Sequence, residues 1–142
     1  MLIGNQIASM RVQKLVDEGI TQVLKVNGIK SMMPYAQYGI EERVVDMEDS
    51  PDYTITDKNL KDSFEFIGRP GKKTLVVCTA GISRSATVCI SYLMWAENMP
   101  LAEAFDKVKS ARQFINPNKG FLKFLEHYEA ARKQKLLQFA KL

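Results

Sequence analysis

The sequence predicts an α/β fold in which a mostly parallel central sheet of four to five strands is flanked by helices and continues into a helical C-terminal half. Three observations lead to this fold class. Short apolar runs alternate with amphipathic segments in the first half of the chain. One run of β-formers, residues 74–77, passes through a short loop directly into helical spacing. Helical spacing then continues almost to the C-terminus, as in layered α/β proteins.

The first half supplies most of the expected strands. One short strand is expected to begin with Leu2 and Ile3. Two more are expected over residues 20–26 and 43–47. The apolar spacing favours helices over residues 7–16 and 55–67, with Gly19 placed to end the first. Asn27-Gly28 is expected to turn the chain. Residues 29–38 are aperiodic and predict a loop, with an edge strand near its end as an alternative, and residues 48–54 form an acidic loop.

The second half starts with residues 68–73, a turn that leads into the buried strand 74–77. After Ser83 the apolar residues recur at helical spacing, namely Ala86, Cys89, Ile90, Leu93 and Met94. Helices are therefore expected over about 83–98, 101–114 and 119–140.

Composition bounds the kind of protein. The 142 residues fit one domain, 1–142, and 46% hydrophobic with 25% charged residues is ordinary for a soluble globular protein. No apolar run is long enough for a membrane span. The net charge of +4 suits an anionic substrate without indicating nucleic-acid binding. A monomer is favoured.

The two cysteines, Cys78 and Cys89, are not an obvious disulfide pair, which favours an intracellular compartment, cytoplasmic or nuclear. With one histidine, His127, they cannot form a zinc site of the usual type. We expect neither a metal nor another cofactor.

The loop after strand 74–77 is the candidate site. Cys78 ends the strand, and Arg84 follows with five residues between them. A strand, a tight loop and a helix start can direct backbone amides and the helix dipole at an anion. A thiol in that setting should have a lowered pKa, and an arginine can bind two phosphate oxygens. These two side chains in one loop indicate phosphoryl transfer to sulfur, and we expect phosphate or sulfate to bind there.

The segment Cys78-Thr-Ala-Gly-Ile-Ser-Arg84-Ser85-Ala-Thr closely resembles the signature loop of the dual-specificity protein phosphatases, within the cysteine-based protein tyrosine phosphatase superfamily. Further similarities cover residues 2–8, 19–24, 91–94, 101–105 and 115–121, so the resemblance extends from Leu2 to about Glu129. It implies hydrolysis of phosphotyrosine and phosphoserine or phosphothreonine in proteins through a cysteinyl-phosphate. One departure is Val77, where the family normally has histidine.

The loop residues acquire roles from their chemistry and from the resemblance. Cys78 is the expected nucleophile, and the planar Arg84 guanidinium binds the phosphoryl group through the transition state. Gly81 permits the turn that directs the amides inward. Ser85 resembles the hydroxyl that eases thiolate departure, although it could also cap the helix. The phosphoryl group is expected to contact the whole loop, Cys78, Thr79, Ala80, Gly81, Ile82, Ser83 and Arg84.

The resemblance also implies an aspartate that protonates the leaving oxygen, from a loop before the cysteine strand. Family members place it about six positions before the first apolar residue of the next helix. That residue is Ile55, which favours Asp49. Asp46 alternates with valines at a strand end and Asp52 fits a turn or cap, so Asp46 stays the alternative acid.

Two supporting residues complete the prediction. Asn118 resembles the asparagine that hydrogen-bonds the catalytic loop, but it could equally cap the helix that follows. Val77 cannot hydrogen-bond through its side chain, so the pKa of Cys78 should lie above that of typical relatives and below the free value of about 8.5. A weakened enzyme is expected, and Val77→His should lower that pKa.

The sequence leaves several substrate classes as alternatives. The uncharged loop side chains favour phosphoproteins over lipid or RNA phosphates, because lipid-phosphate relatives often carry lysines there. The order of acid before cysteine argues against the low-molecular-weight tyrosine phosphatases. A different class remains as an alternative, a weak or inactive phosphatase-like module that binds phosphorylated partners.

Overall fold

The computed structural model of the chain describes residues 1–140, with side chains described for residues 1–136. Its sheet has four strands, β1 (Leu2–Asn5), β2 (Gln22–Lys25), β3 (Glu41–Val44) and β4 (Thr74–Cys78). All pair in parallel, in the order β1-β4-β2-β3. The expected fold class is therefore confirmed, and β4 lies in the interior of the sheet.

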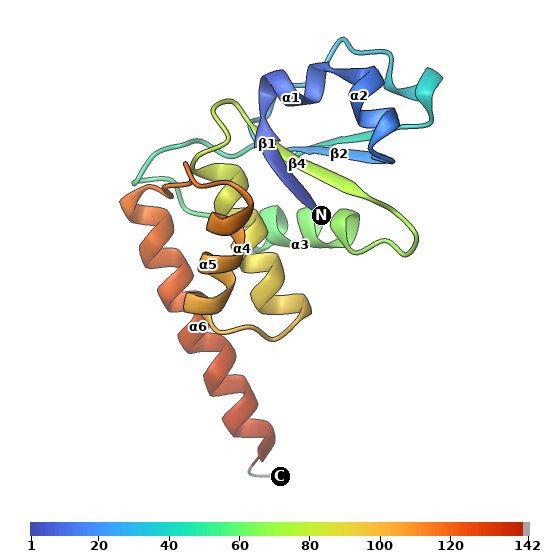
Figure 1. Ribbon diagram of the computed structural model, residues 1–142. Helices are drawn as coiled ribbons and strands as arrows, with labels where there is room; N and C mark the ends of the chain where they lie inside the picture. Colours follow the sequence, from blue (N-terminus) through green and yellow to red (C-terminus); the bar gives the residue numbers. More distant parts are fainter. Residues whose placement is uncertain (141–142) are drawn as a thin grey trace.

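Helices cover both faces of the sheet (Figure 1). On one side lie α1 (Gln6–Met10), α2 (Val12–Asp17) and the short 3-10 helix η1 (Tyr35–Tyr38). On the other lie α3 (Asp57–Ile67), α4 (Arg84–Ala96), α5 (Leu101–Ala111) and α6 (Lys119–Ala140). None of the helices in the described part of the chain is long and apolar enough to cross a membrane.

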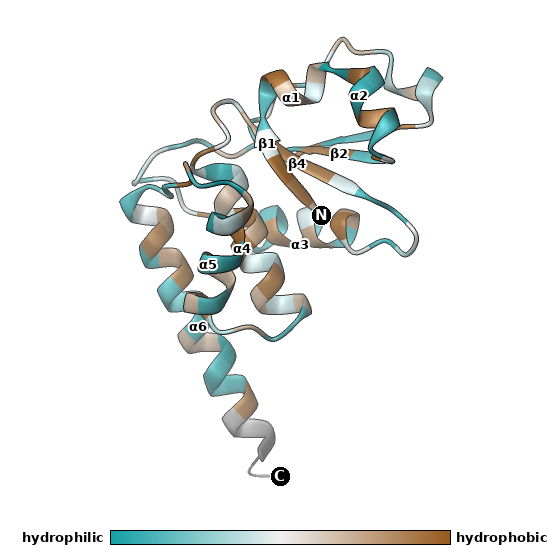
Figure 2. Cartoon of the chain, viewed as in Figure 1, coloured by the Kyte–Doolittle hydropathy of each residue, from teal (hydrophilic) through white to brown (hydrophobic). Residues whose placement is uncertain are grey.

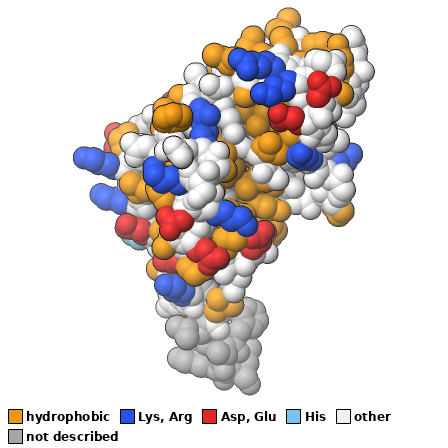
Figure 3. All heavy atoms as spheres, viewed as in Figure 1, with side chains coloured by type: hydrophobic (Ala, Val, Ile, Leu, Met, Phe, Trp, Pro, Cys, Tyr) orange, Lys and Arg blue, Asp and Glu red, His pale blue; other side chains and the backbone are white. Residues whose placement is uncertain are grey.

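The alternation of side chains along β4 separates two apolar clusters. Val76 and Cys78 point into the larger cluster, between the sheet and helices α3 to α6. Leu75 and Val77 point into the smaller one, beneath α1 and α2. Figure 2 shows the interior strand β4 as largely hydrophobic and the helices as striped, in keeping with one buried face on each helix. Figure 3 shows acidic and basic side chains interspersed over the visible face.

Two local predictions were wrong. The expected helix 7–16 is interrupted at Arg11, whose φ of −87° and ψ of 69° are not helical. The Tyr35 hydroxyl donates to the Ser9 carbonyl, which a continuous helix would use for its own ladder. The alternative edge strand near residue 38 is instead η1, which ends at Tyr38 and is followed by Gly39 with a φ of 71°.

The third strand is shifted relative to its prediction of 43–47. It begins at Glu41 and ends at Val44 because it pairs with β2 in the register Gln22↔Glu41 to Lys25↔Val44. The residues after Val44 therefore leave the sheet and form the loop that carries the candidate acids. Since carboxyl ends of parallel strands share one edge, this loop and the Cys78 loop lie at the same end of the molecule.

Candidate active site

The Cys78 loop joins β4 to α4, as the sequence predicted. Cys78 is the last residue of β4, and α4 begins at Arg84. Gly81 has φ +68°, and a Cβ atom there would lie 2.7 Å from the Gly4 carbonyl oxygen. Any other residue at this position would be strained and would collide with β1, so the tight turn requires glycine.

The loop favours the ionised form of the Cys78 thiol. Burial by itself would raise the pKa of Cys78, but hydrogen bonds oppose it and lower the pKa below its usual value. They come from the Ser85 hydroxyl, whose Oγ lies 3.2 Å from Sγ, and from the backbone amides of Ser85, Gly81 and Ile82. The sulfur is thus surrounded by donors that can also serve a bound anion.

Ser85 contributes to the site by this contact and not as a helix cap. The N-cap of α4 is Ser83, and Ser85 is its second helical residue, fully buried behind Cys78. The alternative capping role expected from the sequence is therefore wrong. A hydroxyl this close to the sulfur can donate a hydrogen bond to a thiolate.

Arg84 is half-buried and directed toward the loop that carries the candidate acids. Its Nη1 donates to the Met47 carbonyl over 3.1 Å. Its Nε is buried and has no hydrogen-bond partner among the described residues. A buried guanidinium N–H without an acceptor is costly, and a phosphoryl oxygen would satisfy it.

The three candidate acids have different surroundings. Asp49 is exposed, and its Oδ1 accepts a hydrogen bond from Asn118 Nδ2 over 2.9 Å. Asp46 lies against the turn at Gly28, where an added Cβ would come 2.4 Å from its Oδ1. Asp52 belongs to a turn in which its amide donates to Ser50 Oγ over 3.2 Å. Of the three, Asp49 has a side-chain hydrogen bond to a residue that also contacts the catalytic loop.

That residue, Asn118, makes both contacts that the sequence left open. Its side-chain Oδ1 accepts from the Phe121 amide over 2.9 Å and so caps α6. Its backbone amide donates to Ser83 Oγ over 3.0 Å, in the catalytic loop. Together with the side-chain bond to Asp49, these contacts connect the acid loop, the catalytic loop and α6 to one residue.

Sequence reasoning missed two residues that hold the loop from outside, Arg112 and Asn27. Arg112, just after α5, donates from Nε to the Gly81 carbonyl over 2.8 Å and from Nη2 to the Ala80 carbonyl over 3.3 Å. Asn27 donates to Thr79 Oγ1 over 3.1 Å and to Gln6 Oε1 over 3.2 Å. Because these partners take the loop's outward carbonyl and hydroxyl groups, the loop amides remain available to an anion.

Val77 does not face the sulfur. It is fully buried on the opposite side of β4, in the cluster with Leu75, Tyr35 and Ile40. The amides and the Ser85 hydroxyl lower the pKa of Cys78 without any polar group at this position.

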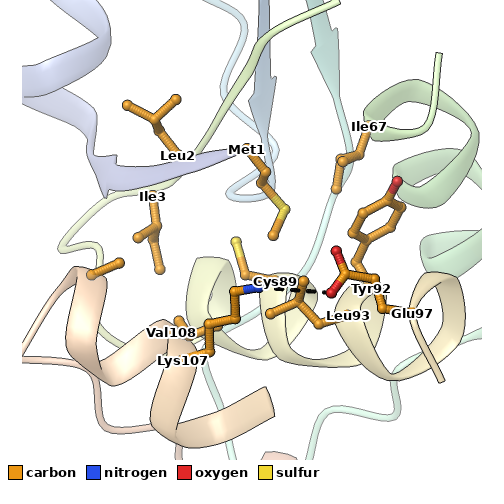
Figure 4. Close-up of a pocket in the computed structure, with 11 residues that line it drawn as sticks. Met1, Leu2, Ile3, Ile67, Cys89, Tyr92, Leu93, Glu97, Lys107 and Val108 are labelled. Carbon is orange, nitrogen blue, oxygen red and sulfur yellow. Dashed lines mark ion pairs between the residues drawn. The ribbon is translucent and has the colours of Figure 1, made fainter. Parts of the chain in front are cut away.

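A separate pocket of about 380 Å³ lies between β1, α4 and α5 (Figure 4). It is lined by Ile3, Leu93 and Val108, and Lys107 and Glu97 form an ion pair at its edge, 3.7 Å apart. Cys89 also lines it, and burial raises the pKa of this thiol to about 12. Cys89 is therefore a buried structural cysteine and not a second nucleophile. Within the described residues no cluster of three or more His, Cys, Asp or Glu side chains could hold a metal ion.

The comparison with known proteins agrees with this geometry. A family model described as dual specificity phosphatase, catalytic domain, matches residues 1–131. Dual specificity protein phosphatase 26 of Homo sapiens is 36% identical over 132 residues, which cover 88% of this chain and 62% of that protein. Human dual specificity protein phosphatase 18 is 33% identical over 131 residues, 91% of this chain and 69% of the relative.

A similar solved structure is that of human DUSP28, with a TM-score of 0.81 and 32% identity over 94% of each chain. The chain spans less than two thirds of the length of several curated relatives, including human dual specificity protein phosphatase 26. The activity, substrates and partners of those whole proteins are therefore proposals for this chain.

Proposed function

The chain belongs to the dual specificity phosphatase family, and from this premise we propose that it hydrolyses phosphotyrosine and phosphoserine or phosphothreonine in proteins through a cysteinyl-phosphate at Cys78. The observation that carries the proposal is the lowered pKa of Cys78 inside a loop whose amides and Arg84 can bind a phosphoryl group. Residues 1–142 would then form one catalytic domain. The protein would act inside the cell, where a reducing environment keeps the thiol active.

In the first step the Cys78 thiolate attacks phosphorus in line with the leaving oxygen. The S–P bond forms while the P–O bond to the substrate side chain breaks. Arg84 and the loop amides bind the equatorial phosphoryl oxygens and stabilise the transition-state charge. Asp49, held by Asn118, donates its proton to the departing oxygen.

In the second step water attacks the phosphorus of the cysteinyl-phosphate. Asp49, now a carboxylate, accepts the proton of that water, and the S–P bond breaks to release inorganic phosphate. The Ser85 hydroxyl, 3.2 Å from the sulfur, donates a hydrogen bond to the departing thiolate. Removing this charge-assisted bond would make the thiolate a poorer leaving group.

Turnover of an aryl phosphate tests the proposal most directly. The wild type should release phosphate in the presence of a chelator, and rapid acid quenching should trap a phosphoenzyme. Cys78→Ser should lose both signals, whereas Cys89→Ser, at the buried cysteine in α4, should keep them. Activity in Cys78→Ser that equals the wild type, or activity that disappears with chelator, would contradict the proposal.

The alternative of a phosphopeptide-binding module without turnover gives a different result in the same assay. The wild type would then bind phosphopeptides but release no phosphate. The presence of Cys78, Arg84 and Asp49 together supports the enzyme over that module, because binding alone needs neither a nucleophile nor a proton donor.

A further inference from the structure

Two segments that hold the catalytic loop also expose a large apolar side chain beside it. The Gln6 amide donates to the Thr79 carbonyl over 3.2 Å, and the next residue, Ile7, is 60% exposed. Asn27 holds Thr79 Oγ1 and accepts from the amide of Ile29, which is 47% exposed. Each apolar residue is therefore within two positions of a group bonded to the loop.

A third segment, residues 112–116, also holds the catalytic loop and exposes a large apolar side chain. Arg112 holds the Gly81 carbonyl and the Asn116 amide donates to the Ile82 carbonyl over 2.8 Å. Phe114 lies between these two anchors and is 76% exposed. Ile82, in the loop itself, is 37% exposed. We call this set the apolar rim: Ile7, Ile29, Ile82 and Phe114.

The position of the apolar rim distinguishes it from scattered surface residues. A single exposed apolar side chain is common and needs no explanation. Here four come from four segments, and since consecutive Cα atoms are about 3.8 Å apart, each backbone is about 8 Å or less from a group bonded to the catalytic loop. Apolar side chains that gather around a polar site are typical of a recognition surface.

We propose, resting on the phosphatase function above, that the apolar rim binds the residues on either side of the phosphorylated side chain. The enzyme would thus select phosphoprotein segments with apolar flanking residues. Phosphate in the catalytic loop would supply the anchor, and the apolar rim would bury the neighbouring side chains from water.

The charge of the remaining side of the site determines what else can bind. The loop after β3 carries four exposed acidic residues, Asp46, Glu48, Asp49 and Asp52. No Lys or Arg lies between Arg43 and Lys58 in the sequence. These charges repel acidic flanking residues within a Debye length of about 8–10 Å. They would equally repel an anionic membrane, since phosphoinositide recognition relies on clusters of basic residues. A peptide with apolar neighbours therefore fits this site better than a lipid surface.

The test uses three phosphotyrosine peptides that differ only at the two residues beside phosphotyrosine, which are leucine, serine or glutamate. Wild-type kcat/KM should follow the order leucine, serine, glutamate, with about a tenfold difference between the first two. Phe114→Ser and Ile29→Ser should each reduce the leucine-to-serine ratio about threefold to fivefold. Aryl phosphate turnover should not change in either variant, because neither side chain belongs to the catalytic machinery. Leu136→Ser, an exposed leucine near the far end of α6, is the matched control and should behave like the wild type.

Several outcomes would overturn the inference. Equal kcat/KM for the leucine and serine peptides would do so, and so would a preference that survives in both rim variants. Hydrolysis of a phosphoinositide in phosphatidylcholine vesicles at higher kcat/KM than the leucine peptide, lost in Phe114→Ser, would assign the apolar rim to a membrane instead. If the wild type fails to turn over aryl phosphate, the proposed function fails, and fluorescence anisotropy with the same three peptides still tests the rim. Equal dissociation constants for leucine and serine peptides would then exclude it.

Discussion

The side chains of Asn118 and Asp49 are joined by a hydrogen bond of 2.9 Å, although 69 positions separate them in the chain. Asn118 donates through Nδ2, while its Oδ1 caps α6 and its backbone amide contacts Ser83 of the catalytic loop. The bond occupies Asp49 Oδ1 and leaves Oδ2 for proton transfer. One residue therefore couples the position of the proposed acid to that of the phosphate-binding loop.

Asp49→Asn should slow turnover by about 10²–10⁴-fold for substrates with poor leaving groups, because the departing oxygen no longer receives a proton. Substrates with very good leaving groups should be affected far less, and the basic limb of the pH profile should disappear. Asp46→Asn is the matched control, since Asp46 packs on the Gly28 turn. If Asp46→Asn shows this pattern and Asp49→Asn does not, the assignment of the acid is wrong.

Asn118→Ser separates the two side-chain roles of Asn118. Serine caps a helix about as well as asparagine, so the melting temperature should stay close to that of the wild type. Serine is too short to replace the hydrogen bond from the Asn118 side-chain amide to Asp49. Turnover of substrates with poor leaving groups should therefore fall, while substrates with good leaving groups should be little affected. Asn118→Ala should show the same kinetic defect and also lose about 1 kcal/mol of stability. Wild-type kinetics in Asn118→Ser would show that the bond to Asp49 has no positioning role.

Ser85→Ala should raise the pKa of Cys78, because it removes the side-chain hydrogen bond that stabilises the thiolate while the backbone amides remain. Iodoacetate alkylation of Cys78 as a function of pH measures this directly. Hydrolysis of the phosphoenzyme should slow by about 10²-fold, as for loss of one oxyanion donor. The quenched phosphoenzyme should consequently accumulate. An unchanged alkylation profile would contradict the role of the 3.2 Å contact.

Cys89 should make the protein less stable at alkaline pH. Its folded pKa is about 12, and that of the unfolded thiol is about 8.5. The stabilisation is fully present below the unfolded pKa and is lost as the pH rises toward 12, because the unfolded state then binds fewer protons than the folded state. Urea unfolding at several pH values above 8.5 should show a steeper loss of unfolding free energy in the wild type than in Cys89→Ala. Parallel curves would refute this account.

Val77→His should cost about 1–3 kcal/mol of stability, because an imidazole would be buried among apolar side chains beside Leu75 and Tyr35. The family resemblance still predicts a lower pKa of Cys78 in this variant. Thermal unfolding and the alkylation profile measure the two effects separately. Val77→Ala, which leaves the site equally apolar, is the control for lost packing. A raised pKa in Val77→His would oppose the electrostatic role of the family histidine.

Much of the fold was predictable because its signals are local. The strand 74–77, the loop and the start of α4 occupy consecutive residues, so their spacing alone indicated an anion-binding loop. Helices α5 and α6 also begin at the predicted residues, Leu101 and Lys119, because the helical spacing of apolar residues is itself a local signal. By contrast, the break at Arg11 depends on Tyr35, whose hydroxyl takes a helix carbonyl from 26 positions away.

The sequence by itself determined the parallel α/β class and the placement of Cys78 and Arg84 in one loop, since both depend on short-range periodicity and on residue chemistry. Only the tertiary structure decided which aspartate meets Asn118, how Arg112 and Asn27 hold the loop, and which face of β4 Val77 occupies. The physical reason is that these contacts join segments distant in the chain. Their partners are selected by strand order and helix packing, which no local pattern of residues encodes.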